Sequence, residues 1–147
     1  MIKRILFLTL ITSTILLAFS FTTNKPTDTN NGKGGIVFFN GKWKDALAKA
    51  KAENKLIFLD IYATWCGPCK KLKAKSFASA KVGTHFNEKF INVTLDGEEG
   101  EGIILAEKYR LQAYPTLLFI DGDGNVKKAA VGYYNPNELL SLGKAAK

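Results

Sequence analysis

The sequence is poor in the side chains that bind metals. Among 147 residues it has two cysteines, Cys66 and Cys69, and a single histidine, His85. A structural zinc ion is held by four ligands, most often cysteine and histidine. Two thiols and one distant imidazole fall short of that number, so we expect no metal site.

Charge of one sign is not concentrated along the chain. The net charge is +8, with 21 lysines and arginines against 13 acidic residues. The lysines are spread among acids and form no basic stripe interleaved with aromatic residues, so we expect no nucleic-acid partner. Internal repeats are also absent. A chain of 147 residues that is 46% hydrophobic suffices for one globular domain with its own core.

The long apolar run of the sequence is confined to its N-terminus. Residues 1–4 form a short cationic head, and 5–19 is an apolar stretch that is short for a membrane span. Ala18-Phe19-Ser20 has the small-x-small pattern of a signal-peptidase site, so we interpret 1–20 as a signal peptide. An uncleaved membrane anchor is the alternative. No cysteine lies near the cut, which excludes a lipid-modified N-terminus.

A polar segment separates this leader from the rest of the chain. Residues 21–35 are rich in threonine, asparagine and glycine and show no hydrophobic periodicity, which is typical of a flexible tether. We therefore expect one folded domain over residues 36–147.

Within that domain, apolar runs of strand length alternate with helical patterns. Leu56–Tyr62 is apolar nearly throughout, as expected of a central strand covered on both faces. Asp121-Gly122-Asp123-Gly124 predicts a hairpin turn, and Asn135-Pro136 with Glu138 predicts the capped start of a closing helix. The pattern predicts strands over 36–39, 56–62, 90–95, 116–120 and 126–131, and helices over 42–53, 70–77, 79–88, 103–109 and from 136.

The two cysteines stand where a strand passes into a helix. The stretch Trp65-Cys66-Gly67-Pro68-Cys69-Lys70 follows the strand 56–62 and precedes a run of helix formers. Cys66 would lie at the helix N-terminus, where unpaired backbone N–H groups and the helix dipole favour a thiolate. Pro68 suits the first helical turn, so the helix begins between the two sulfurs and holds them within bonding reach.

The spacing of the cysteines argues against a purely structural bridge. A disulfide across two residues closes so small a loop that it removes little entropy from the unfolded chain. A reactive dithiol/disulfide pair is the better interpretation, and a structural bridge is the alternative.

Taken together, these features resemble the thioredoxin-fold family of thiol:disulfide oxidoreductases. The resemblance covers residues 36–147 and rests on Cys66-Gly67-Pro68-Cys69, on Asp60 ahead of them, and on Tyr114-Pro115-Thr116 before a hairpin. It implies an α/β fold, with a central mixed β-sheet flanked by helices. The signal peptide makes the chain most similar to exported bacterial members.

The resemblance implies a role for four residues. Cys66 would be the more exposed sulfur and attack a substrate disulfide, and Cys69 would resolve the mixed disulfide. Asp60 would be buried with a raised pKa and take the Cys69 proton, unless backbone N–H groups satisfy it. Pro115 would be a cis-proline that leaves the preceding backbone free to pair with a substrate strand, unless it is an ordinary turn proline.

Further residues are expected to bind substrate around these four. Trp65 would support the active-site surface, or would be an ordinary core aromatic. Tyr114 is large for its place before the cis-proline and would narrow the range of substrates. The complete expected set is Trp65, Gly67, Pro68, Tyr114 and Thr116.

Other polar positions are given lesser roles. Asn92 stands where many thioredoxins carry a lysine near the buried aspartate, so a proton relay through that lysine is not expected here. His85 has no partner at motif spacing and is interpreted as a surface helix residue. Glu98, Glu99 and Glu101 fit no Ca²⁺ loop and are interpreted as solvated.

The chain is accordingly predicted to be a protein-disulfide reductase in the periplasm or outside the cell, anchored to the membrane if the leader is not cleaved. Gly67-Pro68 matches the reducing members of the family. Expected partners are protein disulfides and a membrane thiol carrier that donates electrons. No bound cofactor is expected, and a monomer is the default. Alternatives are a thiol reductant for cytochrome maturation and a non-catalytic binding module.

Overall fold

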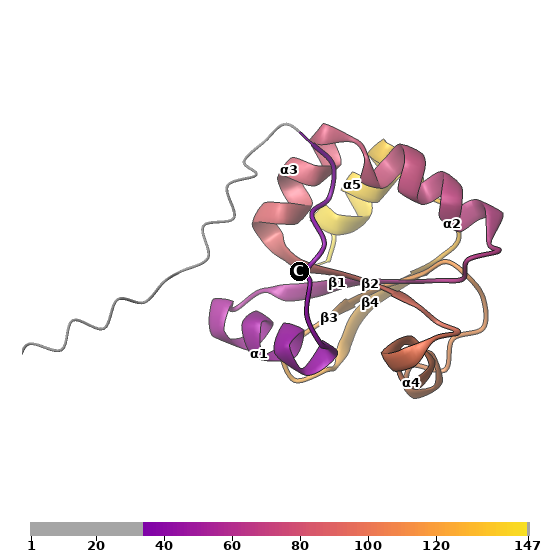
Figure 1. The fold of residues 1–147 in the computed structure, drawn as a ribbon. Helices are drawn as coiled ribbons and strands as arrows, with labels where there is room; N and C mark the ends of the chain where they lie inside the picture. Colours follow the sequence, from indigo (N-terminus) through magenta and orange to yellow (C-terminus); the bar gives the residue numbers. More distant parts are fainter. Residues whose placement is uncertain (1–33, 147) are drawn as a thin grey trace, which may run out of the picture.

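The computed structural model describes residues 34–146, which form a four-stranded sheet with helices on both faces (Figure 1). The predicted signal peptide and most of the predicted tether lie outside the described residues. In chain order the elements are α1 (Trp43–Glu53), β1 (Leu56–Tyr62), α2 (Gly67–Lys71), the π-helical segment η1 (Leu72–Phe77), α3 (Ala80–Lys89), β2 (Phe90–Asp96), α4 (Gly100–Lys108), β3 (Thr116–Ile120), β4 (Val126–Val131) and α5 (Pro136–Lys144).

The sheet is mixed, as predicted. Its strand order is β2-β1-β3-β4, with β1 parallel to β2 and antiparallel to β3, and with β3 antiparallel to β4. The predicted central place of β1 is therefore confirmed. Within the described residues, no helix combines the length and apolarity needed to cross a membrane.

Strand β1 is buried on both faces because its side chains alternate between two cores. Ile57, Leu59 and Ile61 belong to the core on the side of α1 and α4. Phe58 belongs to the core on the side of α3, η1 and α5, where it packs against Phe77 and Phe86. Because side chains of a strand alternate with a period of two, Asp60 projects into the same layer as Phe58.

Loops from distant parts of the sequence meet at one edge of this sheet. The parallel pairing places Tyr62, the last residue of β1, opposite Asp96, the last residue of β2. The Gly97 N–H donates to the Tyr62 carbonyl at 2.8 Å, and β3 starts at Thr116, opposite Ile61. The loops before α2, after β2 and before β3 are therefore brought together.

The prediction of a strand over 36–39 is wrong. This segment, which we name the strap, is held beside β2 largely by side-chain amides. The Val37 N–H donates to Asn87 Oδ1 at 2.9 Å, and Asn92 Nδ2 donates to the Val37 carbonyl at 3.2 Å. The Phe39 N–H donates to the Asn92 carbonyl at 2.7 Å. Because side-chain amides compete with a regular ladder for the backbone groups, the strap does not become a fifth strand.

The helices agree with the predictions except at some of their starts. Helix α2 begins at Gly67, so the prediction that the helix begins between the two sulfurs is confirmed, and it passes at Leu72 into η1. Ser79 is the N-cap of α3, so the predicted break there is confirmed. Helix α4 begins at Gly100, earlier than the predicted 103.

The closing helix has its predicted cap. Asn135 Oδ1 accepts hydrogen bonds from the N–H groups of Asn137 and Glu138 at 3.0 and 3.1 Å. Glu138 Oε2 in turn accepts from the Asn135 N–H at 2.8 Å. This reciprocal capping box fixes the start of α5.

Candidate functional site

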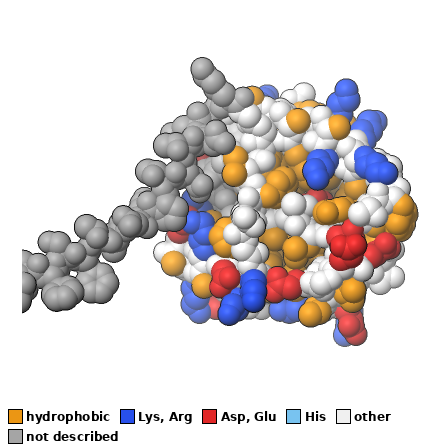
Figure 2. Space-filling view, viewed as in Figure 1, with side chains coloured by type: hydrophobic (Ala, Val, Ile, Leu, Met, Phe, Trp, Pro, Cys, Tyr) orange, Lys and Arg blue, Asp and Glu red, His pale blue; other side chains and the backbone are white. Residues whose placement is uncertain are grey.

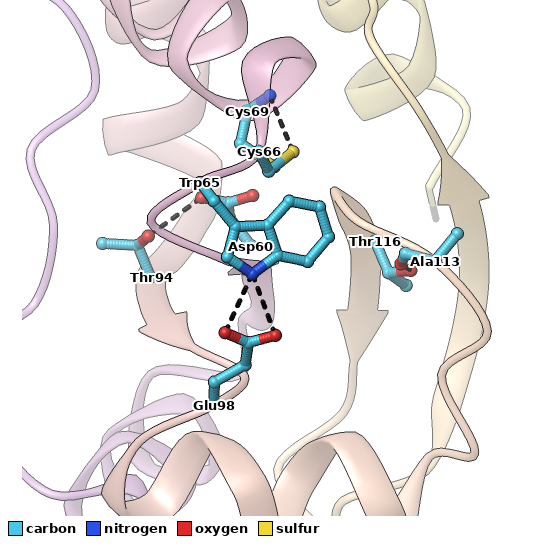
Figure 3. Close-up of a disulfide and its surroundings, with 8 residues drawn as sticks. All are labelled: Asp60, Trp65, Cys66, Cys69, Thr94, Glu98, Ala113 and Thr116. Carbon is cyan, nitrogen blue, oxygen red and sulfur yellow. Dashed lines mark hydrogen bonds between the residues drawn. A yellow bond between two sulfur atoms is a disulfide. The ribbon is translucent and has the colours of Figure 1, made fainter.

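Cys66 and Cys69 form a disulfide at the start of α2. Cys66 is the N-cap residue of this helix, and its Sγ accepts a hydrogen bond from the Cys69 N–H at 3.1 Å (Figure 3). Pro68 stands in the first turn, where its missing N–H leaves no donor unpaired. Backbone N–H groups and the positive end of the helix dipole stabilise a sulfur that carries negative charge. The predicted place of Cys66 at the helix N-terminus is therefore confirmed.

Both cysteines are buried in this disulfide form, and neither residue stands out as the more exposed. Cys66 is 3% exposed and Cys69 is 6% exposed. The partly buried residues Tyr62 and Tyr114 pack against the cluster that contains both cysteines, which accounts for their low exposure. Access to Cys66 therefore depends on the position of these two tyrosines.

Asp60 is buried behind the disulfide, with 4% of its surface exposed (Figure 3). Thr94, at the paired position on β2, donates its hydroxyl hydrogen to Asp60 Oδ2 at 2.9 Å. The other oxygen, Oδ1, has no hydrogen-bond partner among the described residues. The alternative in which backbone N–H groups satisfy this carboxyl is therefore wrong.

The electrostatic surroundings of Asp60 favour its neutral form. Burial raises the pKa of Asp60 from 3.8 to about 7, and outweighs the Thr94 hydrogen bond and the attraction of Lys73, which both lower it. The predicted burial and raised pKa are thus confirmed. The lysine that acts on Asp60 comes from η1 and not from position 92, since Asn92 holds the strap.

Pro115 is a cis-proline, as predicted, so the alternative of an ordinary turn proline is wrong. It is buried, and its carbonyl accepts a hydrogen bond from the Gly132 N–H at 2.8 Å. Thr116 is buried beside it and donates its hydroxyl hydrogen to the Ala113 carbonyl at 2.7 Å (Figure 3). The Thr116 hydroxyl thus holds the turn before β3 from the inside.

Trp65 is a surface residue, 67% exposed, so the alternative of a core aromatic is wrong. Its indole Nε1 donates to both carboxylate oxygens of Glu98, at 3.0 and 3.1 Å (Figure 3). Its ring meets the ring of Tyr114 edge-on, with the centroids 6.1 Å apart. Gly67 and Pro68, at the start of α2, are exposed beside Trp65. The disulfide is therefore bordered by an accessible, mainly apolar surface.

A capping disulfide, a buried acid behind it and a cis-proline thus occupy one edge of a mixed sheet. A family model described as a thioredoxin-like domain matches residues 43–147. The chain belongs to this thioredoxin-like family. Family and site together support thiol:disulfide oxidoreductase activity of the Cys66–Cys69 pair.

Several known proteins are similar to this thioredoxin-like chain. The solution structure of a disulphide-isomerase candidate from Bacteroides thetaiotaomicron is 43% identical, with a TM-score of 0.67, over 78% of this chain and 97% of its own. Thioredoxin of Echinococcus granulosus is 50% identical over 74 residues, which make up 50% of this chain and 64% of its own. The thiol:disulfide interchange protein DsbD of Yersinia pestis is 33% identical over 94 residues, which make up 62% of this chain and 16% of its own. The match thus spans less than two thirds of the Echinococcus protein and a small part of DsbD.

A groove of about 640 Å³ extends from the active-site loop of the thioredoxin-like domain toward α4. We name it the α4 groove. Tyr114 forms one wall of the groove, and its side chain packs closely on Gly97. A Cβ atom at position 97 would lie 2.6 Å from the tyrosine hydroxyl oxygen. Only glycine at position 97 leaves room for the ring in this place. Its lining includes Trp65, Gly97, Ile103, Glu107, Leu111 and Tyr114.

The interpretation of the acidic stretch as solvated is confirmed for Glu98 and Glu99, which are exposed, and is wrong for Glu101, which is partly buried. Glu98 accepts from the Trp65 indole, as described above. Glu101 Oε2 accepts a hydrogen bond from the Trp43 N–H at 2.9 Å, which ties the start of α1 to α4. Both side chains therefore hold parts of the fold in place.

The interpretation of His85 as a surface residue is also wrong. The imidazole is half-buried against Phe86 and Phe90, each with a centroid separation of 6.0 Å, and its Nε2 is buried without a hydrogen-bond partner among the described residues. Burial, followed by the nearby charges of Lys144 and Lys89, lowers the pKa of His85. His85 lies on α3, outside the site described here.

Sequence reasoning missed Thr94 and the contact of Glu98. The strands 56–62 and 90–96 have equal lengths, and aligning their first residues pairs Asp60 with Thr94. The pairing of these two residues could therefore have been predicted from the register of the strands. No local signal points to Glu98, because its contact with Trp65 depends on how the loop after β2 folds.

Proposed function

We propose that this chain is a protein-disulfide reductase of the cell envelope that works through Cys66 and Cys69. The observation that carries the proposal is the hydrogen bond from the Cys69 N–H to Cys66 Sγ at the start of α2. A sulfur so placed is stabilised as a thiolate when the pair is reduced, which makes Cys66 the nucleophile toward a substrate disulfide. Tyr114, which precedes the cis-proline Pro115, packs against the cluster that contains both cysteines, and Asp60 lies behind the disulfide (Figure 3).

The proposed reaction begins with the reduced pair. The Cys66 thiolate attacks one sulfur of the substrate disulfide, an S–S bond forms between them, and the other substrate sulfur leaves as a thiolate. Cys69 then loses its proton and attacks Cys66 Sγ, which releases the second substrate sulfur and forms the disulfide seen here. Two electrons pass from the cysteines to the substrate, and the released thiolates take up protons.

Asp60 is the proposed acceptor of the Cys69 proton. A carboxylate with an ordinary pKa near 4 is a weak base for a thiol, whose pKa is about 8.5 in a peptide. Burial raises the pKa of Asp60 to about 7, which brings it closer to that of the thiol. Its Oδ1, which has no partner among the described residues, is available to hold the proton.

The Gly67-Pro68 pair between the cysteines supports reduction rather than oxidation of the substrate. Equilibration of the purified chain with thiol/disulfide buffers at neutral pH measures its reduction potential, which decides the direction of electron transfer. We expect a reduction potential of about −270 mV, as for thioredoxin, and a value of about −120 mV, as for the strongest oxidants, would contradict the proposal.

The proposed electron donor is a membrane thiol carrier, which would return two electrons to the disulfide by the same exchange chemistry. The similarity to a segment of DsbD, a thiol:disulfide interchange protein, supports a partner of this kind. Residues 1–20 are proposed to direct export. Mass analysis of the protein from cells tests this: a mature chain that begins at Phe21 in the envelope supports it, and an intact chain in the cytosol contradicts it.

The client proteins can be captured with a trapping variant. In Cys69→Ser the mixed disulfide on Cys66 persists, because no second thiol resolves it. Captured proteins with haem-attachment cysteines would indicate cytochrome maturation. If Cys66→Ser and Cys69→Ser both left the activity of the protein in cells intact, the chain would be a binding module instead.

A further inference from the structure

The surface around the disulfide is divided by charge. Lysines gather over α2 and η1, whereas acids gather near α4, with hydrophobic side chains between them (Figure 2). The lysines on the first side are Lys70, Lys71, Lys73 and Lys75. The acids on the second side are Glu98, Glu99, Glu101 and Glu107. The proposed reaction uses neither group directly, so the division bears on which substrates are accepted.

Two of the acids stand at the α4 groove. Glu107 lines it, and Glu98 holds the indole of Trp65 at its entrance. Neither carboxylate forms an ion pair with a lysine or arginine within residues 34–146. Among the described residues, no lysine or arginine lines the groove. The groove therefore presents two carboxylates that form no close ion pair among the described residues.

Trp65 and Ile103 give the groove apolar surface beside these carboxylates. Trp65 is 67% exposed and Ile103 is 49% exposed. A cation is attracted to the face of a tryptophan ring, and arginine is found there more often than lysine. The methylene groups of a long cationic side chain pack on apolar surface while its charged head reaches a carboxylate.

We propose that the α4 groove binds an arginine or lysine side chain of the substrate, close in sequence to the cysteine whose disulfide Cys66 attacks. This proposal rests on the proposed reductase function, because the substrate disulfide must reach Cys66 while the basic side chain occupies the groove. The whole chain carries a net charge of +8, which opposes cationic partners. Preference for a basic side chain would therefore be a local property of the groove.

Peptide substrates test the preference directly. A disulfide-linked peptide pair carries one arginine, moved in turn through the positions on either side of the cysteine. Citrulline, which is neutral and of the same shape, and glutamate replace the arginine in matched peptides. The reduced full-length chain is mixed with each peptide, and the rate constant for reduction of the peptide disulfide is measured. This rate constant is divided by the one for reduction of 2-hydroxyethyl disulfide, a small neutral compound.

We expect at least one arginine peptide to be reduced about tenfold faster than its citrulline counterpart, with the glutamate peptide slower still. The ratio should shrink in about 0.5 M salt, because exposed charges are screened. In Glu98→Gln/Glu107→Gln the ratio should fall to about one. The control Asp45→Asn/Glu88→Gln removes the same charge from α1 and α3 and should keep the wild-type ratio.

The outcomes separate this inference from the proposed function. Reduction of 2-hydroxyethyl disulfide without an arginine preference at any position overturns the groove proposal and leaves the reductase intact. A preference that survives in Glu98→Gln/Glu107→Gln likewise overturns it. A wild-type chain that reduces none of the disulfides overturns the reductase proposal and this inference with it.

Discussion

Thr94 donates its hydroxyl hydrogen to Oδ2 of Asp60 at 2.9 Å, and the two residues are partners in the parallel pairing of β2 with β1. Burial pushes the pKa of Asp60 upward, and the Thr94 hydroxyl opposes that rise by stabilising the carboxylate. The balance between the two leaves a carboxyl that titrates near neutral pH behind the disulfide.

Replacement of Thr94 by valine should raise the pKa of Asp60 further. Thr94→Val keeps the branched shape but removes the donor, so the charged form of Asp60 loses a hydrogen bond and the pKa rises by roughly one unit. An NMR titration of the Asp60 carboxyl carbon in the oxidised protein measures this shift. Thr84→Val is the matched control, because the exposed Thr84 hydroxyl donates to the Ala80 carbonyl on α3. An Asp60 pKa that stays constant or falls in Thr94→Val contradicts the assignment.

The raised pKa of Asp60 predicts how stability depends on pH. The native carboxyl has a pKa of about 7, against 3.8 as the ordinary value, so between these pH values the native state binds more protons than the unfolded state. The contribution of Asp60 to the free energy of unfolding should therefore decrease as pH rises from 4 to 7, and level off above 7. The loss is roughly 4 kcal/mol at most.

The variant Asp60→Asn isolates this effect because its side chain cannot ionise. Urea unfolding of the oxidised proteins at a series of pH values gives the difference in stability between variant and wild type. We expect the variant to gain stability relative to wild type as pH rises through this window. Parallel stability curves for the two proteins would exclude a raised pKa at Asp60.

Asn92 should matter for stability through the strap. It is 3% exposed, and its side-chain Nδ2 donates to the Val37 carbonyl and to Asn87 Oδ1, each at 3.2 Å. Asn92→Leu leaves the Val37 carbonyl without its donor, whereas Asn87 Oδ1 still accepts from the Val37 N–H, and the variant should lose about 1–3 kcal/mol in the free energy of unfolding. Urea unfolding measures the loss, with Asn137→Ala on the exposed side of α5 as the control. An unchanged unfolding midpoint in Asn92→Leu would show that the side chain does not hold the strap.

The parts of the fold that could be predicted carry strong local signals. Asn135-Pro136 with Glu138 predicts a capped helix because capping uses residues within one turn. Leu56–Tyr62 predicts a central strand because it is apolar on both faces. Cys66, Asp60 and Pro115 could be placed from their resemblance to a family whose fold fixes their spacing.

The parts that could not be predicted depend on contacts between distant residues. The strap fails as a strand because Asn87 and Asn92 take its hydrogen bonds, and no pattern within 36–39 reveals this. The low exposure of Cys66 depends on Tyr114, which the pairing of β3 with β1 brings to the disulfide. The π-helical segment η1 has no recognised sequence signal.

Alkylation of Cys66 by iodoacetamide at neutral pH tests the central claim most directly, because only the thiolate reacts. The reduced variant Cys69→Ser keeps the backbone N–H that donates to Cys66 Sγ and leaves a single thiol in the chain. We predict that Cys66 reacts on the order of tenfold faster than the thiol of an unstructured peptide. A rate equal to that of the peptide, in a protein shown to be folded, would contradict activation of Cys66 by the start of α2.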